Sequence, residues 1–432
     1  MKMKLNEDVR NLLIAMSVGL VLGIAMICLP AFHHDLDCFK TWGGNILDMG
    51  TGNFYEYGYD RPTDYPPIYM LVCALMAAIC REVNTNTFWQ DFLFRLPTVF
   101  IFVVNIYLFY QIARHFKISS KKTLILTLIL AVAPAIMIDI KWGQVDCFTM
   151  FFVMISTLMF LKQKYFASMM CCTLGLLTKI QFIFILPVLG VAILYRYIKE
   201  KKIGRFFLNL LICLLIYFIV YLPFIYKQLG QGDIFYIFRV LIDQITHYQT
   251  YATNAFNLYT GLGLNGDIYP NWYYIINFGI IFIFVALSVV LVIKNPSDKN
   301  VVLTSAYLVT AIFMMSTSMH ERYMLPVIGI MLIISHVINS KKLLIINYFF
   351  YIVQFINTYF AWYLYIGNGF HHNWIAILLS LLSVAIFALF TYEVVRYTFS
   401  KNDTKKDMQE DTVSAETKNI DTLDNRAENR SN

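Results

Sequence analysis

Charged residues are scarce in this sequence. Asp, Glu, Lys and Arg make up only 14% of the 432 residues, whereas an average soluble domain contains roughly 25%. Hydrophobic residues make up 59%, and the mean hydropathy is +0.61. No polar stretch is long enough for a large soluble domain, and apolar segments recur from end to end. We therefore expect an all-α polytopic membrane protein.

The eight cysteines form no metal-binding pattern. Most lie inside apolar runs, and the chain contains neither a CxxC motif nor a Cys/His spacing typical of zinc. This argues against a zinc site and against a disulfide framework. The net charge of +7 does not indicate nucleic-acid binding either, because the basic residues lie mostly in short loops, where they set membrane topology.

The N-terminal apolar run lacks a small-x-small cleavage site. It covers 11–30, which is long enough to span a membrane, so we expect an uncleaved first helix. The complete set of expected crossings is 11–30, 93–113, 123–138, 147–162, 165–178, 180–195, 206–224, 273–293, 301–316, 323–338, 343–365 and 374–395.

The apolar segment 67–80 is shorter than a full span, and its length is typical of a re-entrant or interfacial segment. If it does not cross, the N-terminus and the basic loops 114–122 and 196–205 share one face, which the positive-inside rule assigns to the cytoplasm. We predict about 12 transmembrane helices (range 11–13), a helical first outer loop and both termini in the cytoplasm. Residues 1–395 then form one integral membrane domain, and the polar tail 396–432 is expected to be disordered.

The opposite face receives nearly every unusual polar motif of the chain. These segments are the loop 31–66, IKWGQVD (140–146), TKIQ (178–181), the loop 225–272, MHERY (319–323) and GNGFHHN (367–373). Because the topology follows from the basic loops alone, the convergence of these motifs on one face predicts an active site on the extracytoplasmic face.

Two acids, Asp35 and Asp37, follow the first crossing directly. On an extended segment both side chains would share a face, whereas on a helix they would diverge. One interpretation is a solvated acidic loop. The other is a general base at the mouth of a membrane cavity, alone or with a metal ion. Asp35, Asp37 and Asp146 are the candidate ligands of a divalent cation, Mg²⁺ or Mn²⁺.

Aromatic and amide side chains accompany these acids. Trp42 and Tyr65 either belong to an interfacial belt or stack on sugar faces. Trp142 and Gln144 lie where a span emerges, and Asp146 either caps the following helix or contacts substrate.

Two further segments on the same face contain basic residues, and each of them allows two interpretations. Lys179, followed by Gln181, either snorkels to the interface or binds a phosphate at membrane depth. The triplet His320, Glu321 and Arg322 is either an exposed ion pair of little energetic weight or a phosphate site built on the arginine.

Taken together and in this order, the motifs resemble a known family. Asp35 with Trp42, Tyr65–Pro67 (YPP), WGQVD, Lys179-x-Gln181 and MHERY are similar to motifs of the bacterial GT-C glycosyltransferases that resemble GPI-anchor mannosyltransferases, over residues 11–395. The resemblance implies inverting transfer of a mannose-like hexose from a polyprenyl-phosphate donor to a glycan, lipid or protein acceptor on the outer face. It implies that Asp35 is the catalytic base, with Asp37 as second candidate.

Two other functions use the same architecture. A transporter or flippase of lipid-linked sugars would also carry intramembrane charges, but it would be expected to show repeat-related halves, and the sequence has no internal repeat. A polysaccharide polymerase would share both the helices and an outer-face site. A lipid-phosphate donor does not chemically require a metal ion, so the divalent cation stays an open alternative.

Overall fold

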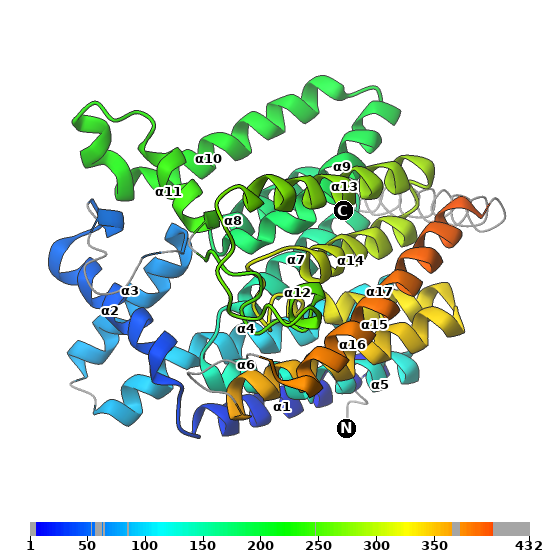
Figure 1. The fold of residues 1–432 in the computed structure, drawn as a ribbon, viewed down its shortest axis with the longest axis horizontal. Coiled ribbons are helices and arrows are strands. Elements are labelled where there is room, and N and C mark those ends of the chain that lie inside the picture. The colour runs from blue at the N-terminus through cyan, green and yellow to red at the C-terminus, as the bar shows by residue number, and fades with distance from the viewer. Residues whose placement is uncertain are drawn as a thin grey trace, which may run out of the picture.

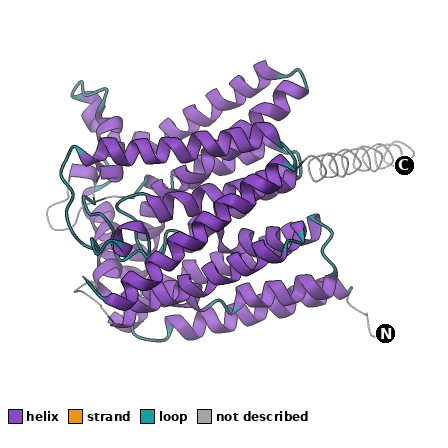
Figure 2. Ribbon diagram, turned by 45° about the vertical axis from the view of Figure 1, so that its right-hand side comes forward, coloured by secondary structure: helices purple, strands orange, loops and turns teal. Residues whose placement is uncertain are grey.

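The fold is known from a computed structural model, which describes residues 6–52, 54–56, 63, 65–83, 86–246, 248–364 and 372–400. Within these ranges the regular elements are helices, accompanied by a few isolated β-bridges (Figure 2). The predicted all-α class is therefore confirmed. Most of GNGFHHN and most of the predicted tail lie outside the described residues.

The helices follow the chain in a simple order (Figure 1). They are α1 (Glu7–Ile27), α2 (His33–Met49), η1 (Phe54–Glu56), α3 (Pro67–Glu82), α4 (Thr87–His115), α5 (Ser120–Ala131), α6 (Pro134–Trp142), α7 (Asp146–Leu161), α8 (Tyr165–Leu176), η2 (Ile180–Ile185), α9 (Leu186–Lys199), α10 (Ile203–Gly230), α11 (Tyr236–Thr246), α12 (Leu258–Gly261), α13 (Tyr273–Lys294), α14 (Asp298–Met315), α15 (Leu325–Ile338), α16 (Lys341–Tyr359), the π-helix η3 (Phe360–Leu364) and α17 (Trp374–Phe399).

Seven described helices are long and apolar enough to cross a membrane, or eight if the bent pair α5 and α6 is one span. The polytopic membrane class is thus confirmed. Each of the twelve expected crossings contains a described helix, but α7, α8 and α15 have only 12 to 16 residues. At 1.5 Å per residue these are shorter than the roughly 30 Å hydrocarbon core. The count of twelve spans stays a prediction.

The expected crossing 123–138 is a bent pair of helices, α5 and α6, and not one straight helix. The chain bends by 40° between α5 and α6, because Pro134 has no N–H to donate and disfavours helical geometry at Ala133. Proline is well placed at the start of α6, where it is the first helical residue. The break brings the end of α6, at Trp142, to the end of the bundle where α2 lies.

Helices α2 and α3 form a hairpin at that end (Figure 1). Apolar residues at helical spacing on α2, namely Leu36, Phe39, Trp42 and Ile46, are buried in one hydrophobic cluster with α3. At Gly43 an added Cβ would lie 2.7 Å from the carbonyl carbon of Cys73, so this close approach requires glycine. The first loop, which the sequence predicted to be helical, forms α2, and segment 67–80 is helical as well.

The starting end of α1 and the last turn of α17 lie at the opposite end of the bundle from α2 and α3 (Figure 1). The start of α1 and the last turn of α17 thus lie at the same end of the bundle (Figure 1). Helix α17 continues to Phe399, beyond the boundary at 395 that the sequence suggested, and α10 continues to Gly230, past the expected start of the long loop at 225.

The long loop folds back over the MHERY segment. The N–H of Thr253 donates to the carbonyl of Met319 (2.9 Å), and the N–H of Ser318 donates to the carbonyl of Thr250 (2.9 Å). The carbonyl of Asn254 accepts a 2.6 Å hydrogen bond from the Asn357 amide on α16. Residues 248–257 are therefore a fixed part of the fold beside His320–Arg322.

Candidate active site

A polar cavity of about 230 Å³ lies where α2 meets the ends of α6, α8 and α14. Most of the candidate residues line it, together with five residues that the sequence did not single out as site residues. The lining consists of His34, Asp35, Cys38, Phe39, Trp42, Tyr65, Gln144, Lys179, Gln181, Tyr248, Arg322 and Tyr323. Segments far apart in the sequence thus meet at one site.

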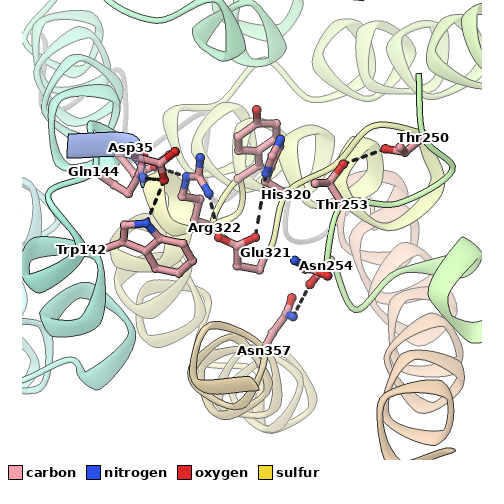
Figure 3. Close-up of polar contacts among 12 residues, drawn as sticks. Asp35, Trp142, Gln144, Thr250, Thr253, Asn254, His320, Glu321, Arg322 and Asn357 are labelled. Atoms are coloured by element: carbon pink, nitrogen blue, oxygen red, sulfur yellow. Dashed lines mark hydrogen bonds and ion pairs between the residues drawn. The ribbon is translucent and has the colours of Figure 1, made fainter. Parts of the chain in front are cut away.

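Asp35 is held by two neutral donors (Figure 3). The indole Nε1 of Trp142 donates to Oδ2 at 2.8 Å, and the side-chain amide of Gln144 donates to the same oxygen. Gly143, between them, has the left-handed conformation (φ +88°) that ends α6 and turns both side chains toward Asp35. Among the described residues no donor reaches Oδ1 of Asp35, so this oxygen is available to accept a proton.

Asp37 lies away from this cavity. Two residues along a helix correspond to a rotation of about 200°, and α2 places Asp37 beside His33 and Lys40, each 3.7 Å from its Oδ1. Lys40 in turn binds Asp91 of α4. The hypothesis that both acids share one site is therefore wrong for this helix, and Asp37 belongs to a partly exposed charge network between α2 and α4.

A compact cluster of four charges lies at the cavity, and its two cations, Lys179 and Arg322, belong to the cavity lining. Lys179 Nζ binds both carboxylate oxygens of Asp146, at 2.8 and 2.9 Å, and both side chains are only 2% exposed. Arg322 Nη1 donates to Glu321 at 2.8 Å, and its Nε lies 3.4 Å from Asp146. The two cations therefore balance the two carboxylates.

Three single-residue interpretations from the sequence are corrected by this cluster. Lys179 does not snorkel, because its ammonium is buried against Asp146. Asp146 is the first residue of α7, and α7 has no side-chain cap bond, so capping is not its role. Glu321 and Arg322 are not an exposed rim pair, since they are 2% and 8% exposed.

The electrostatics of the Glu321–Arg322 pair follow from burial. Burial raises the pKa of the Glu321 carboxyl, and the adjacent Arg322 opposes that rise. Burial also disfavours the charged guanidinium, but the neighbouring carboxylates, Glu321 foremost, hold the pKa of Arg322 well above its ordinary value. Arg322 thus remains a cation at the cavity wall.

Aromatic rings surround the two cations. Lys179 Nζ lies 5.3 Å from the ring centroid of Tyr323 and 5.9 Å from that of Tyr65, and the Arg322 guanidinium lies 5.7 Å from the ring of Trp142. These are cation–π distances. Gln181 donates to the Tyr323 hydroxyl at 2.9 Å, which fixes the amide at the cavity wall.

His320 packs behind the cavity, beside two tyrosines that the sequence did not nominate. Its ring lies 4.6 Å from that of Tyr248 and 5.0 Å from that of Tyr323. Tyr323 is the last residue of MHERY, so it could have been identified as a site residue from this motif. Tyr248 comes from the long loop, and only the pairing of that loop with MHERY reveals its place.

A second, apolar cavity of about 310 Å³ adjoins the polar one. Gln181, Tyr248 and Tyr323 line both cavities. The rest of the second cavity is formed largely by apolar residues of η2, α9, α13 and α14, such as Phe184, Ile281 and Val285. A polar chamber and an apolar chamber therefore share one wall.

Asp35, Asp37 and Asp146 do not form the metal-binding group that the sequence suggested. Each acid has different partners, and the described part of the chain contains no cluster of three or more His, Cys, Asp or Glu side chains arranged to hold a metal ion.

Residues 31–195 match the family model of the MptA_B family, described as alpha-(1->6)-mannopyranosyltransferase, N-terminal domain. No curated protein matches the chain. The family match agrees with the resemblance to membrane mannosyltransferases and supports glycosyl transfer of mannose. The matched region contains Asp35, Trp142, Gln144, Asp146 and Lys179, and it ends before MHERY.

Proposed function

We propose that the protein is a GT-C-type transferase that moves a mannose-like hexose from a polyprenyl phosphate to an acceptor glycan, lipid or protein, with inversion at the sugar carbon. The observation that carries the proposal is the shared wall between a polar cavity containing Asp35 and an apolar cavity. A lipid-linked sugar has the same two-part chemistry, because a polar head is joined to a long hydrocarbon tail.

The polar cavity is suited to a ligand with several hydroxyls. Three buried polar atoms in its lining, Trp42 Nε1, Gln144 Oε1 and Gln181 Oε1, have no hydrogen-bond partner among the described residues. Each such atom costs about 1–3 kcal/mol when unpaired. Sugar hydroxyls donate to the two amide oxygens and accept from the indole, so a bound pyranose would remove this cost.

The charge cluster is suited to the donor phosphate. Lys179 and Arg322 line the cavity, and their carboxylate partners hold them in fixed positions. Fixed cations aimed at an oxygen that gains charge stabilise the transition state without reorganising. In this proposal the phosphate lies against Lys179 and Arg322, and the prenyl tail enters the apolar cavity.

Asp35 acts as the base in the proposed reaction. Its Oδ1 takes the proton of the acceptor hydroxyl while the hydroxyl oxygen attacks C1 of the sugar. The bond between C1 and the phosphate oxygen breaks, and its electron pair leaves with the polyprenyl phosphate. Trp142 and Gln144 hold Oδ2, so the carboxylate is oriented before the acceptor arrives.

We place this reaction at the outer face of the cell membrane, with both termini in the cytoplasm. The cavity lies at the end of the bundle away from the start of α1 and the end of α17, and the short basic loops favour a cytoplasmic position for that opposite end (Figure 1). Residues 1–395 constitute the transferase domain in this proposal.

The direct test uses purified full-length protein in lipid nanodiscs. The probes are a synthetic polyprenyl-phosphate mannose with a labelled sugar, and membranes from cells that lack this chain as the source of acceptors. We expect transfer of one labelled sugar and release of polyprenyl phosphate. In proteoliposomes, movement of intact donor without cleavage would instead identify a flippase, and a ladder of long products would identify a polymerase.

Cys38 offers an independent test of the cavity. Its side chain lines the polar cavity and is partly exposed, whereas Cys73 is 1% exposed in the α2–α3 core. In variants that retain one cysteine each, we expect a small maleimide to label Cys38 and to leave Cys73 unmodified. Polyprenyl-phosphate mannose should slow labelling at Cys38. Equal labelling rates with and without this donor would contradict its proposed position.

A further inference from the structure

Arg95 of α4 is an almost fully buried arginine, 1% exposed, whose partners are backbone carbonyls. Its Nε donates to Asp91 (2.9 Å) and its Nη2 to Ile27 (2.8 Å), while Nη1 donates to both Leu29 and Lys141 at 3.0 Å. The last carbonyls of a helix lack intrahelical donors and form the negative end of its dipole. Arg95 supplies these donors to the ends of α1 and α6 together.

The two chain segments that Arg95 joins are the ones that carry the proposed base and its donors. Leu29 lies in the short connection from α1 into α2, which bears Asp35, and Lys141 immediately precedes Trp142. One guanidinium group therefore links the segment that leads to Asp35 with the segment that carries Trp142 and Gln144. Arg95 belongs to none of the sequence motifs, and it lies near the start of the expected crossing 93–113.

Gly143 shows how tightly this connection is packed. A Cβ added there would lie 3.0 Å from Cγ of Arg95 and 3.4 Å from Cδ1 of Leu36. The backbone between Trp142 and Gln144 thus rests directly on the Arg95 side chain. Its φ of +88° also disfavours any residue with a Cβ.

The chemistry of Arg95 favours a positioning role over a purely stabilising one. Its guanidinium forms no ion pair with a carboxylate in the described part of the chain, and an uncompensated buried charge is costly. An apolar side chain would fill the same space without that cost. What arginine alone provides is a planar fork of five donors that can hold several carbonyls in one fixed geometry.

We propose that Arg95 is a positioning residue for transfer, acting through Trp142 and Gln144 on Asp35. The inference rests on the proposed function, in which Asp35 is the base. Misplacing a catalytic group by about 1 Å can cost about 10²-fold in rate. Loss of the planar fork should therefore lower kcat by a larger factor than it raises the donor KM, because Gln144 is only one of several residues proposed to contact the donor.

A double-mutant cycle tests the proposal in the full-length protein. The variants are Arg95→Lys, which keeps the charge but loses the fork, Gln144→Ala, and the two combined; Arg81→Lys, at an exposed arginine, is the matched control. We expect Arg95→Lys to lower kcat about 10²-fold, and the combined variant to be about as active as Arg95→Lys alone. Arg81→Lys should retain full activity.

A merely structural role would give a different result. Arg95→Lys would lower the melting temperature and the folded fraction, kcat per folded molecule would be unchanged, and any effects of Arg95→Lys and Gln144→Ala would multiply. The inference is overturned if kcat per folded molecule is unchanged, and it is also overturned if the effects of the two substitutions multiply. Gly143→Ala perturbs the same contact from the other side, and it replaces Arg95→Lys in the cycle if that variant does not fold. If neither folds, the role is structural and the inference is overturned.

Asp35→Asn separates failure of this inference from failure of the proposed function. An inactive Asp35→Asn variant together with multiplicative effects of Arg95→Lys and Gln144→Ala overturns only the role of Arg95. A fully active Asp35→Asn variant removes the proposed base itself, and the proposed mechanism fails with it.

Discussion

Replacing Asp35 by Asn should abolish nearly all sugar transfer while leaving the protein folded. Asparagine has the same size, and its amide oxygen still accepts from Trp142 and Gln144, which bind Oδ2 in the native protein. It cannot take the proton of the acceptor hydroxyl. Since a positioned general base contributes typically about 10² to 10⁴ in rate, kcat measured with labelled polyprenyl-phosphate mannose should fall by that factor.

Asp37→Asn is the matched control, because it makes the same substitution two residues along the same helix. Asp37 is 41% exposed, and its neighbours are His33 and Lys40 outside the cavity. Surface substitutions away from a functional site usually change stability by about 0.5 kcal/mol or less, so Asp37→Asn should keep a kcat close to that of the native protein. Loss of transfer in Asp37→Asn with retention in Asp35→Asn would move the base to Asp37, and two active variants would refute both assignments.

The separation of these two acids shows what the sequence could establish and what it could not. A helical first outer loop was predictable, and Leu36, Phe39, Trp42 and Ile46 recur at the spacing that buries one face. Which neighbours that face meets is a tertiary question. The packing of α2 on α3 and against the end of α6 decides that Asp35 faces Trp142 whereas Asp37 does not.

The charged residues show the same limit. The sequence placed Asp146, Lys179, Glu321 and Arg322 on one face, and the structure brings all four together. Each residue taken alone suggested a cap, a snorkelling lysine or an exposed pair, because burial depends on contacts between separate segments of the chain. Arg95 was missed for the same reason, since its partners are carbonyls of distant helix ends.

The second prediction with a large effect concerns Lys179 and Asp146, both 2% exposed and bonded through two short contacts. Removing one partner of such a buried pair leaves an uncompensated charge and typically costs about 3–5 kcal/mol. Lys179→Met and Asp146→Asn should each lower the melting temperature of the purified protein strongly. The exposed pair Arg81 and Asp48 is the control, and Arg81→Met should change the melting temperature little.

Combining Lys179→Met with Asp146→Asn separates stability from function. The double variant buries no unpaired charge at these two positions, so its melting temperature should recover toward that of the native protein, as replacement of buried ion pairs by neutral groups usually allows. Transfer should not recover, because the phosphate has lost a fixed cation that stabilises the leaving group. Recovery of both quantities would show that Lys179 serves only Asp146, and would leave Arg322 as the cation for the phosphate at this wall.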